Sequence, residues 1–270
     1  MPLAVCATPI GNLDDVTLRV LAELRQADVV LCEDTRRTRV LLDRHGIEAR
    51  LLSYHRHNEA ARGAEVLDRL RRGERIALVS DAGLPGVNDP GSRLIRVVAA
   101  VGLDVTVLPG ASSVETALVV SGLAGERYQF VGYLPRRVGE LRELARALAR
   151  WEWSVVAFES PRRLPGSLAA LAEEMPERPA AVCRELTKMF EEVARGTLSE
   201  LCGRFAEPPK GEVTIVLGAT PVAAQSAEGL DEALAAVAEL VARGVPRRTA
   251  TDLVARLTGT ARNALYRGSL

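Results

Sequence analysis

The chain has 270 residues, 35 acidic and 35 basic side chains, and a hydrophobic content of 47%. This length is sufficient for two lobes with their own cores, and the composition is typical of a soluble globular protein. The balanced charge gives no overall field that would indicate a nucleic-acid or membrane partner.

Targeting signals and cysteine motifs are both missing. No apolar run reaches the roughly 18 residues that span a bilayer, and the segment Met1–Ala7 has no basic region before its apolar residues. We therefore expect a cytoplasmic protein without a membrane partner. Four widely separated cysteines form no C-x-x-C pair, which predicts buried thiols and no zinc site: Cys6, Cys32, Cys183 and Cys202.

Strands and helices alternate through the first part of the chain. Apolar runs predict strands, and apolar residues at helical spacing predict helices between them, the first capped by Asp14 or Asp15. This alternation predicts an α/β lobe with a mostly parallel sheet over residues 1–112. The expected strands are 3–8, 28–32, 51–54, 76–80 and 104–108. The expected helices begin near 16, 58 and 92, and another follows Glu33–Thr38 and runs to about Arg44.

The next part of the chain contains more strand per helix, which predicts a second α/β lobe with a mixed sheet over residues 113–220. The junction 109–113 leads into a helix that Ser112 or Ser113 can cap. The expected strands are 128–134, 154–158, 180–184, 190–195 and 212–217, with helices at 114–121 and 138–150, from Pro161 to about 174, and from Ser199.

The last part is basic. Residues 221–229 are small and polar, as in a linker, and three short helices are expected near 231–243, 247–257 and 260–266. Between Leu240 and Leu270 there are six arginines and one acid. A small basic helical domain over 228–270 could bind phosphates, with Arg247 and Arg248 as candidates, or it could be a solvated amphipathic appendage.

Residues 76–91 are the best candidate for a ligand loop. An apolar strand runs into Ser80 and Asp81, and then into a segment with three glycines and two prolines. Open α/β sheets bind ligands at the carboxyl ends of their strands. The alternative is an ordinary turn whose glycines and prolines only set its geometry. Within this stretch, Asn88–Gly91 is expected to shape the turn into the next helix.

Several polar loops are expected to meet in a cleft between the lobes. The first lobe contributes 8–15, 80–91 and 109–113, and the second contributes 131–135, 159–163, 184–188 and 210–214. The common nucleotide, hydrolase-elbow and zinc-protease motifs are missing. His55, His57 and Glu59 could hold a metal, but a solvated or RNA-facing loop is favoured, so no metal is expected.

Five segments together resemble one known family: Ala7–Asp15, Glu33–Arg36, Ser80–Gly91, Leu108–Ser113 and Arg184–Lys188. Their order and sequence are similar to those of the ribosomal RNA small subunit methyltransferase I family. That family belongs to the tetrapyrrole methylase superfamily, the class III S-adenosylmethionine-dependent methyltransferases. The resemblance covers roughly residues 3–218, and the arginine-rich tail is similar to the C-terminal part of that family.

The resemblance implies two α/β lobes with the active cleft between them and a small helical C-terminal appendage. It implies 2′-O-methylation of a cytidine in the decoding region of 16S rRNA, with S-adenosylmethionine as donor, no metal, and a homodimer. The partner would be 16S rRNA or the small ribosomal subunit. Matching motifs assign the donor contacts to Pro9, Ser80, Asp81, Ala82, Gly83, Ser112 and Ser113, and the adenine wall to Tyr133, Leu134 and Thr214.

A ribose hydroxyl is a poor nucleophile unless its proton is removed or shared. Candidate bases are Lys188, Glu185 and Glu159. Lys188 is one of only two lysines, and a lysine with a lowered pKa can act as a base, whereas arginine cannot. The alternative for Lys188 is an ion pair with a phosphate or carboxylate.

Paired arginines at loop ends are candidates for RNA phosphate contacts: Arg36, Arg37, Arg136, Arg137, Arg162 and Arg163. Alternatively, each packs its stem on the surface. Two other functions remain open: a tetrapyrrole methylase of the same superfamily, and a non-catalytic RNA-binding assembly factor. The basic tail argues against the first, and Asp81 with its complete loop argues against the second.

Overall fold

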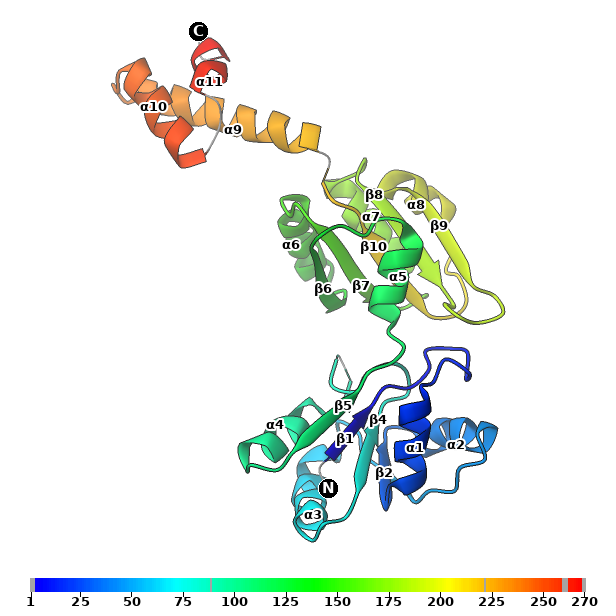
Figure 1. Cartoon of the computed structure of the whole chain (residues 1–270). Coiled ribbons are helices and arrows are strands. Elements are labelled where there is room, and N and C mark those ends of the chain that lie inside the picture. The colour runs from blue at the N-terminus through cyan, green and yellow to red at the C-terminus, as the bar shows by residue number, and fades with distance from the viewer. Residues whose placement is uncertain (1–2, 88, 221, 259–261, 269–270) are drawn as a thin grey trace.

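The computed structural model describes residues 3–87, 89–220, 222–258 and 262–268. Asn88, which was expected to help shape a turn, lies outside these residues, as do parts of the predicted tail domain. Two five-stranded sheets stand one above the other and are joined by a short segment before α5, while the last helices project to one side (Figure 1).

The first sheet is entirely parallel, as predicted. Its order is β3-β2-β4-β1-β5, so the central strand β4 carries its tip into loop 80–91. The carboxyl ends of all five strands therefore meet at one edge. The strands are β1 (Leu3–Cys6), β2 (Val29–Cys32), β3 (Leu51–Ser53), β4 (Ile76–Val79) and β5 (Val105–Leu108).

Helices cover both faces of this sheet. Alternate residues of β1, β2 and β4 point to opposite faces, so one set packs on α1 (Leu18–Gln26) and α2 (Thr35–Arg44), and the other packs on α3 (Glu59–Arg71) and α4 (Ser92–Ala100). Burial on both faces explains why the strands are continuously apolar.

The predicted cap of α1 is wrong. Thr17, not Asp14 or Asp15, is the N-cap, and its hydroxyl accepts a hydrogen bond from the backbone N–H of Val20. Asp14 instead forms a bidentate ion pair with Arg44 at the end of α2. Asp14 therefore pairs with Arg44, which is distant in the sequence, and does not cap α1 as its local position suggested.

The second sheet is mixed, as predicted, in the order β6-β7-β10-β8-β9. Only β6 and β7 are parallel; β10 and β8 pair in antiparallel fashion with their neighbours. Its strands are β6 (Tyr128–Tyr133), β7 (Ser154–Glu159), β8 (Pro179–Arg184), β9 (Glu192–Thr197) and β10 (Val213–Leu217).

Helices α6 (Val138–Ala149), α7 (Leu164–Glu174) and α8 (Leu198–Arg204) pack on one face of this second sheet. Helix α5 (Ser113–Ser121) packs on the other face. The same apolar cluster includes Ile10 from the first lobe and Leu186 from the β8–β9 turn. This cluster holds the two sheets together beside the cleft.

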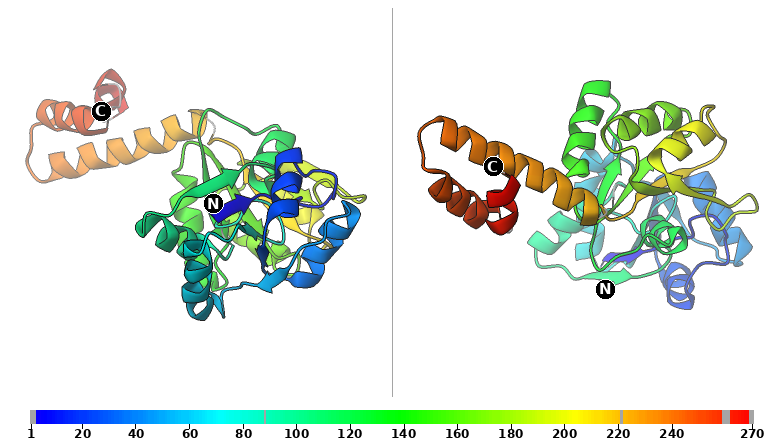
Figure 2. Two further views of the ribbon diagram at one scale, coloured as in Figure 1. Left: turned by 60° about the horizontal axis from the view of Figure 1, so that its bottom comes forward. Right: turned by 90° about the horizontal axis from the view of Figure 1, so that it is seen from above.

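The predicted linker at 221–229 is wrong over 222–229, because helix α9 (Val222–Ala242) already begins at Val222. It is followed by α10 (Arg247–Thr258) and α11 (Arg262–Gly268). These three helices bury a small core of their own and extend away from the sheets (Figure 2). Contact with the lobes includes one long ion pair, Arg150–Glu232 at 3.7 Å.

All four cysteines are free thiols; three are buried and Cys202 is partly buried. Burial raises the pKa of Cys6 and of Cys183 to about 12. Across the described residues, no helix combines the length and apolar character required to cross a bilayer.

Candidate active site

The main cavity lies between the two sheets and has a volume of about 690 Å³. Loops at the carboxyl ends of β4 and β5 form one side, and β6, β7 and β10 form the other. Six of the ten predicted donor contacts line it, from both lobes: Ala82, Gly83, Ser112, Ser113, Tyr133 and Thr214. Pro9, Ser80, Asp81 and Leu134 do not.

The loop after β4 is fixed by hydrogen bonds to the loop after β1. The backbone N–H groups of Thr8 and Gly83 each donate to the other residue's carbonyl, at 2.9 and 3.0 Å. The buried hydroxyl of Ser80 donates to the Gly83 carbonyl at 3.0 Å. Ser80 therefore holds the loop in shape, and the Gly83 main chain, expected to read a ligand, is already hydrogen-bonded within the protein.

The N-terminus of α5 faces the main cavity. Ser112 is the N-cap residue, but its hydroxyl makes no capping bond and donates to Glu115 instead. Glu115 also accepts from the Tyr128 hydroxyl at 2.7 Å. Although partial burial favours the neutral acid, these two hydrogen bonds lower the pKa of Glu115. A carboxylate therefore stands at the positive end of the helix.

Three aromatic rings from β6 and β7 form one wall of the main cavity. Tyr133 and Phe130 both contact Phe158 edge-on, with ring centroids 5.5 and 4.9 Å apart. Phe130 and Phe158 were not singled out from the sequence, and only Phe158 lies near a strand end, where it could have been noticed. Leu134 instead belongs to the core below, with an exposure of 2%.

The main cavity is acidic. Four carboxylates line it, and the described lining residues include no lysine or arginine: Asp89, Glu115, Glu159 and Glu212. Burial, together with Glu33 and Asp81, raises the pKa of Asp89 to about 6. Burial also raises the pKa of Tyr133, and nearby Glu212, Asp89 and Glu159 act in the same direction. The cavity therefore suits a ligand with positive charge.

A second, smaller cavity of about 300 Å³ adjoins the first. Its walls come from loop 8–15, α2, the tip of β4 and the β8–β9 turn, and they include Pro9, Ser80 and Asp81. Ala82 and Glu212 line both cavities, so the two spaces meet at these residues. In contrast to the main cavity, this one contains two cationic side chains, Arg37 and Lys188.

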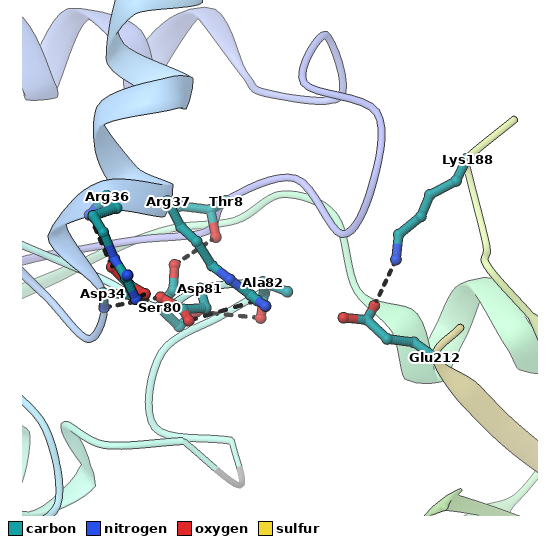
Figure 3. A network of polar contacts seen from close by, with 9 residues as sticks. All are labelled: Thr8, Asp34, Arg36, Arg37, Ser80, Asp81, Ala82, Lys188 and Glu212. Carbon is teal, nitrogen blue, oxygen red and sulfur yellow. Dashed lines mark hydrogen bonds and ion pairs between the residues drawn. The ribbon is translucent and has the colours of Figure 1, made fainter. Parts of the chain in front are cut away.

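Asp81 faces the second cavity and not the main one. Its carboxylate accepts from the backbone N–H of Asp34 at 3.1 Å and lies 3.6 Å from the Arg37 guanidinium (Figure 3). Asp34 is the N-cap of α2 and binds Arg36. Asp81 thus couples the tip of β4 to the start of α2.

Lys188 lies across the second cavity from Asp81, and its ammonium points at the Glu212 carboxylate (Figure 3). Its ammonium donates to Glu185 at 2.9 Å and to Glu212 at 3.0 Å. Partial burial opposes the charge of Lys188, but these two hydrogen bonds outweigh burial and raise its pKa. A base requires the opposite shift, so the contacts of Lys188 contradict the lowered pKa that its predicted role needs.

Glu185 is also engaged. Its carboxylate accepts from the Glu212 backbone N–H at 2.8 Å as well as from Lys188, and these bonds lower its pKa. Glu185 and Thr187 have φ values of 48° and 65°, the left-handed conformation that costs energy for residues with a Cβ. The hydrogen bonds of Glu185 therefore hold the β8–β9 turn in a backbone conformation that is unfavourable by itself.

Glu159 and Arg163 form an internal ion pair. Glu159 is 2% exposed, and it also accepts from Ser160 and Ser167. Arg163 donates to the carbonyls of Leu134 and Pro135 at 3.2 Å. These contacts contradict the prediction that Arg163 is a loop-end arginine for phosphates. Glu159 lines the main cavity, but its hydrogen bonds stabilise the loop between β7 and α7.

The other predicted phosphate contacts lie at the surface. Arg37 faces the second cavity, and Arg36 and Arg137 are exposed but paired with Asp34 and Glu140. Arg136, Arg162 and Arg248 are exposed, and Arg247 is half-buried. The rings of His55 and His57 lie 5.8 Å apart, and no group of three metal-ligating side chains occurs among the described residues.

The sequence profile of the Tetrapyrrole (Corrin/Porphyrin) Methylases matches residues 2–202. The chain belongs to the tetrapyrrole methylase family. Within that family, a protein of Mesorhizobium japonicum named ribosomal RNA small subunit methyltransferase I is 43% identical over 98% of this chain and 90% of its own length. A protein of the same name from Thermotoga maritima is 41% identical over 80% of this chain and 97% of its own length. The chain therefore belongs, within the tetrapyrrole methylases, to the ribosomal RNA small subunit methyltransferase I proteins.

Solved structures of two methyltransferases have the same fold. The methyltransferase CobJ is similar with a TM-score of 0.62 and 22% identity, over 80% of this chain and 93% of its own. Uroporphyrin-III C-methyl transferase from Thermus thermophilus, in complex with S-adenyl homocysteine, is similar with a TM-score of 0.57 and 19% identity, over 81% of this chain and 97% of its own. Because the sequence identities are only 22% and 19%, these similarities establish the fold of the chain alone.

Proposed function

We propose that this tetrapyrrole methylase transfers the methyl group of S-adenosylmethionine to the ribose 2′-hydroxyl of a cytidine in 16S rRNA. The observation that carries the proposal is the acidic, aromatic-walled main cavity between the two sheets, in a chain 43% identical to a protein named ribosomal RNA small subunit methyltransferase I. The cavity volume of about 690 Å³ falls within the range of roughly 300–1,000 Å³ common for small-molecule sites.

The residues of the main cavity fit this methyl donor. Its adenine needs an apolar wall, which Phe130, Tyr133 and Phe158 can supply. Its sulfonium and ammonium groups carry positive charge, which four carboxylates and the lack of described basic lining residues favour. Ser113 at the N-terminus of α5 suits a hydroxyl of the donor's ribose, because the charged Glu115 beside it disfavours a second carboxylate.

The donor supplies an electrophilic methyl carbon on a positively charged sulfur. The protein's contribution is to hold that carbon and the acceptor oxygen in line, since orientation alone can lower the barrier by several kcal/mol. We propose that Ala82, Ser112, Ser113, Tyr133 and Thr214 hold the donor. Gly83 lines the main cavity, and Ser80 and Asp81 keep the loop between the cavities in shape.

We further propose that the partner is 16S rRNA or the small ribosomal subunit, bound by a homodimer of this chain in the cytoplasm. The exposed arginines Arg136, Arg162 and Arg248 favour phosphate contacts. The tail helices form their own core, so they can present Arg247 and Arg248 without disturbing the cleft.

Transfer of a labelled methyl group tests the proposed function. The full chain is incubated with labelled S-adenosylmethionine and, separately, small subunits, naked 16S rRNA, large subunits or a tetrapyrrole. We expect label in 16S rRNA from small subunits or naked RNA, and none in large subunits or the tetrapyrrole. Labelled tetrapyrrole would favour the small-molecule alternative. No detectable heat of donor binding by calorimetry would favour a non-catalytic RNA-binding factor.

Donor affinity should depend on pH through Asp89. Its pKa is raised to about 6, so it is mostly neutral at pH 5 and mostly charged at pH 7.5. A charged carboxylate beside a cationic donor favours binding, so affinity should rise about three- to tenfold over this range. Calorimetry at several pH values measures the change. S-adenosylhomocysteine, which has no sulfonium charge, should show a weaker dependence.

Asp89→Asn serves as the control for this dependence, because it keeps the shape of the side chain and cannot ionise. Its donor affinity should change little between pH 5 and pH 7.5. An Asp89→Asn variant with the same pH dependence as the wild type would exclude Asp89 as its source.

Reversing charge at Arg247 and Arg248 should weaken RNA binding. With both residues changed to Glu, affinity for small subunits should fall about tenfold or more. A plot of the logarithm of the binding constant against the logarithm of salt concentration should become shallower by about one or two. Donor affinity should not change. Filter binding at several salt concentrations and calorimetry check the two effects.

The matched control changes Arg71 and Arg72, at the end of α3, to Glu. These exposed arginines give the same change in net charge on a different surface. Subunit affinity of this control should remain near that of the wild type. Equal weakening by both double variants would mean that overall charge, and not the tail, determines binding.

A further inference from the structure

The Glu212 carboxylate lies where the two cavities meet. Glu212 follows Gly211 just before β10, and it lines both cavities, a property it shares with Ala82. Of the two, only Glu212 carries a group that can accept a proton. Its side chain remains 63% exposed, so the carboxylate can exchange a proton with solvent.

One hydrogen bond reaches this carboxylate, and the backbone that carries it is held in two ways. The Lys188 ammonium donates to its Oε2 at 3.0 Å, and the Glu212 backbone N–H donates to Glu185 at 2.8 Å. Gly211 has a φ of 93°, and a Cβ there would lie 2.4 Å from the Glu185 side chain. The backbone at Gly211 therefore lies so close to the Glu185 side chain that only a residue without a Cβ fits there.

The charges of the two cavities differ. The main cavity has four carboxylates and no basic side chain among its described lining residues, whereas the second balances Arg37 and Lys188 against Asp81 and Glu212. A cationic methyl donor therefore suits the first, and the second, with its two cations, is the better place for a sugar with anionic phosphates. The acceptor hydroxyl would then approach the methyl group at the junction, beside Glu212.

We propose that Glu212 is a catalytic residue that accepts the proton of the ribose 2′-hydroxyl, and that Lys188 is the positioning residue that holds its carboxylate. This inference rests on the proposed function and deepens it. The new bond forms between the 2′-oxygen and the methyl carbon, while the carbon–sulfur bond breaks and its electron pair stays on sulfur. The hydroxyl proton passes to Glu212 and then to water, so charge and atoms balance.

This assignment replaces Lys188 as the base. The ammonium is held in its protonated form by Glu185 and Glu212, with its pKa raised even though partial burial opposes the charge. Glu159 is a weaker candidate, because Ser160, Ser167 and Arg163 already bind its carboxylate. Among the described residues, Lys188 is the one side-chain partner found for the Glu212 carboxylate.

Two substitutions at Glu212 separate catalysis from structure. Glu212→Gln keeps the length and can still accept a hydrogen bond from Lys188, but it cannot take up a proton. Glu212→Asp keeps the carboxylate but shortens it. For a catalytic role, kcat on small subunits falls about a hundredfold or more in Gln and less in Asp. For a purely structural role, Gln is the milder change. Activity of Glu212→Gln equal to or above that of Glu212→Asp overturns the proposal.

Donor binding supplies a readout that is independent of turnover. Calorimetry uses S-adenosylhomocysteine, which lacks the sulfonium charge that the cavity carboxylates favour. Because Glu212 is exposed and its charge is screened by solvent, the dissociation constant of Glu212→Gln is expected to lie within about twofold of the wild type. A dissociation constant tenfold or more weaker would assign Glu212 to donor binding and overturn the proposal.

The wild-type chain is measured in parallel with the same subunits. If it transfers no methyl group, the proposed function and this inference both fall. If it transfers methyl groups and the Gln variant matches it, only the role of Glu212 falls.

Discussion

Replacing Ala82 with phenylalanine is expected to reduce methyl transfer at least about a hundredfold. Ala82 is half-buried and lines both cavities, so a phenyl ring there would occupy the junction across which donor and acceptor must meet. Displacing reacting groups by about 1 Å can cost about a hundredfold in rate. Steady-state kinetics on small subunits measure the loss, and thermal unfolding checks that the variant is folded.

Val119→Phe is the matched control, because Val119 lies on α5 with an exposure of 72%. The same ring added at this surface should leave transfer within about twofold of the wild type. If Ala82→Phe were folded and retained more than about a tenth of wild-type activity, the two cavities could not be the donor and acceptor sites.

Arg178→Ala is expected to lower the free energy of unfolding by about 3–5 kcal/mol. Arg178 has an exposure of 3% and donates to the carbonyls of Leu148, Trp151, Trp153 and Gly218. Burial lowers its pKa to about 10, so it stays charged at neutral pH. Alanine would remove the Arg178 hydrogen bonds of all four carbonyls, of which Leu148 and Trp151 keep another donor, and would create a cavity. Urea unfolding measures the loss.

Arg146→Ala provides the comparison. Arg146 pairs with Glu174, but its side chain is 63% exposed, so its removal should cost less than about 1 kcal/mol. Loss of similar size in both variants would mean that the hydrogen bonds of Arg178 contribute no more than a surface ion pair.

The sheets were predictable because local sequence carries their signal. In β4, the residues Ile76 to Val79 are all buried, and the polar Ser80 and Asp81 follow directly at the strand tip. The greater strand content after residue 128 correctly indicated a mixed sheet. Hydrophobic pattern and turn residues suffice for such features.

The start of the tail was mispredicted because composition pointed in two directions. Residues 222–229 are small and polar, which suggested a linker, but alanine is also the best helix former. In the structure this segment is the first part of α9. Helical propensity therefore outweighed the signal for a loop, and the tail begins earlier than its composition change indicated.

The roles of individual side chains depend on partners that are distant in the sequence. Lys188 lies in a recognisable motif, but one of its two carboxylate partners, Glu212, comes 24 residues later. The family resemblance assigned Asp81 to the donor site, yet its contacts with Asp34 and Arg37 place it in the second cavity. Only the tertiary structure brings these charges together.

Mass spectrometry of nucleosides from methylated small subunits tests the central claim most directly. After incubation with the full chain and S-adenosylmethionine, the digest of 16S rRNA is expected to contain one additional 2′-O-methylcytidine. A methyl group on a nucleobase, on another ribose, or on no nucleoside of 16S rRNA would contradict the account.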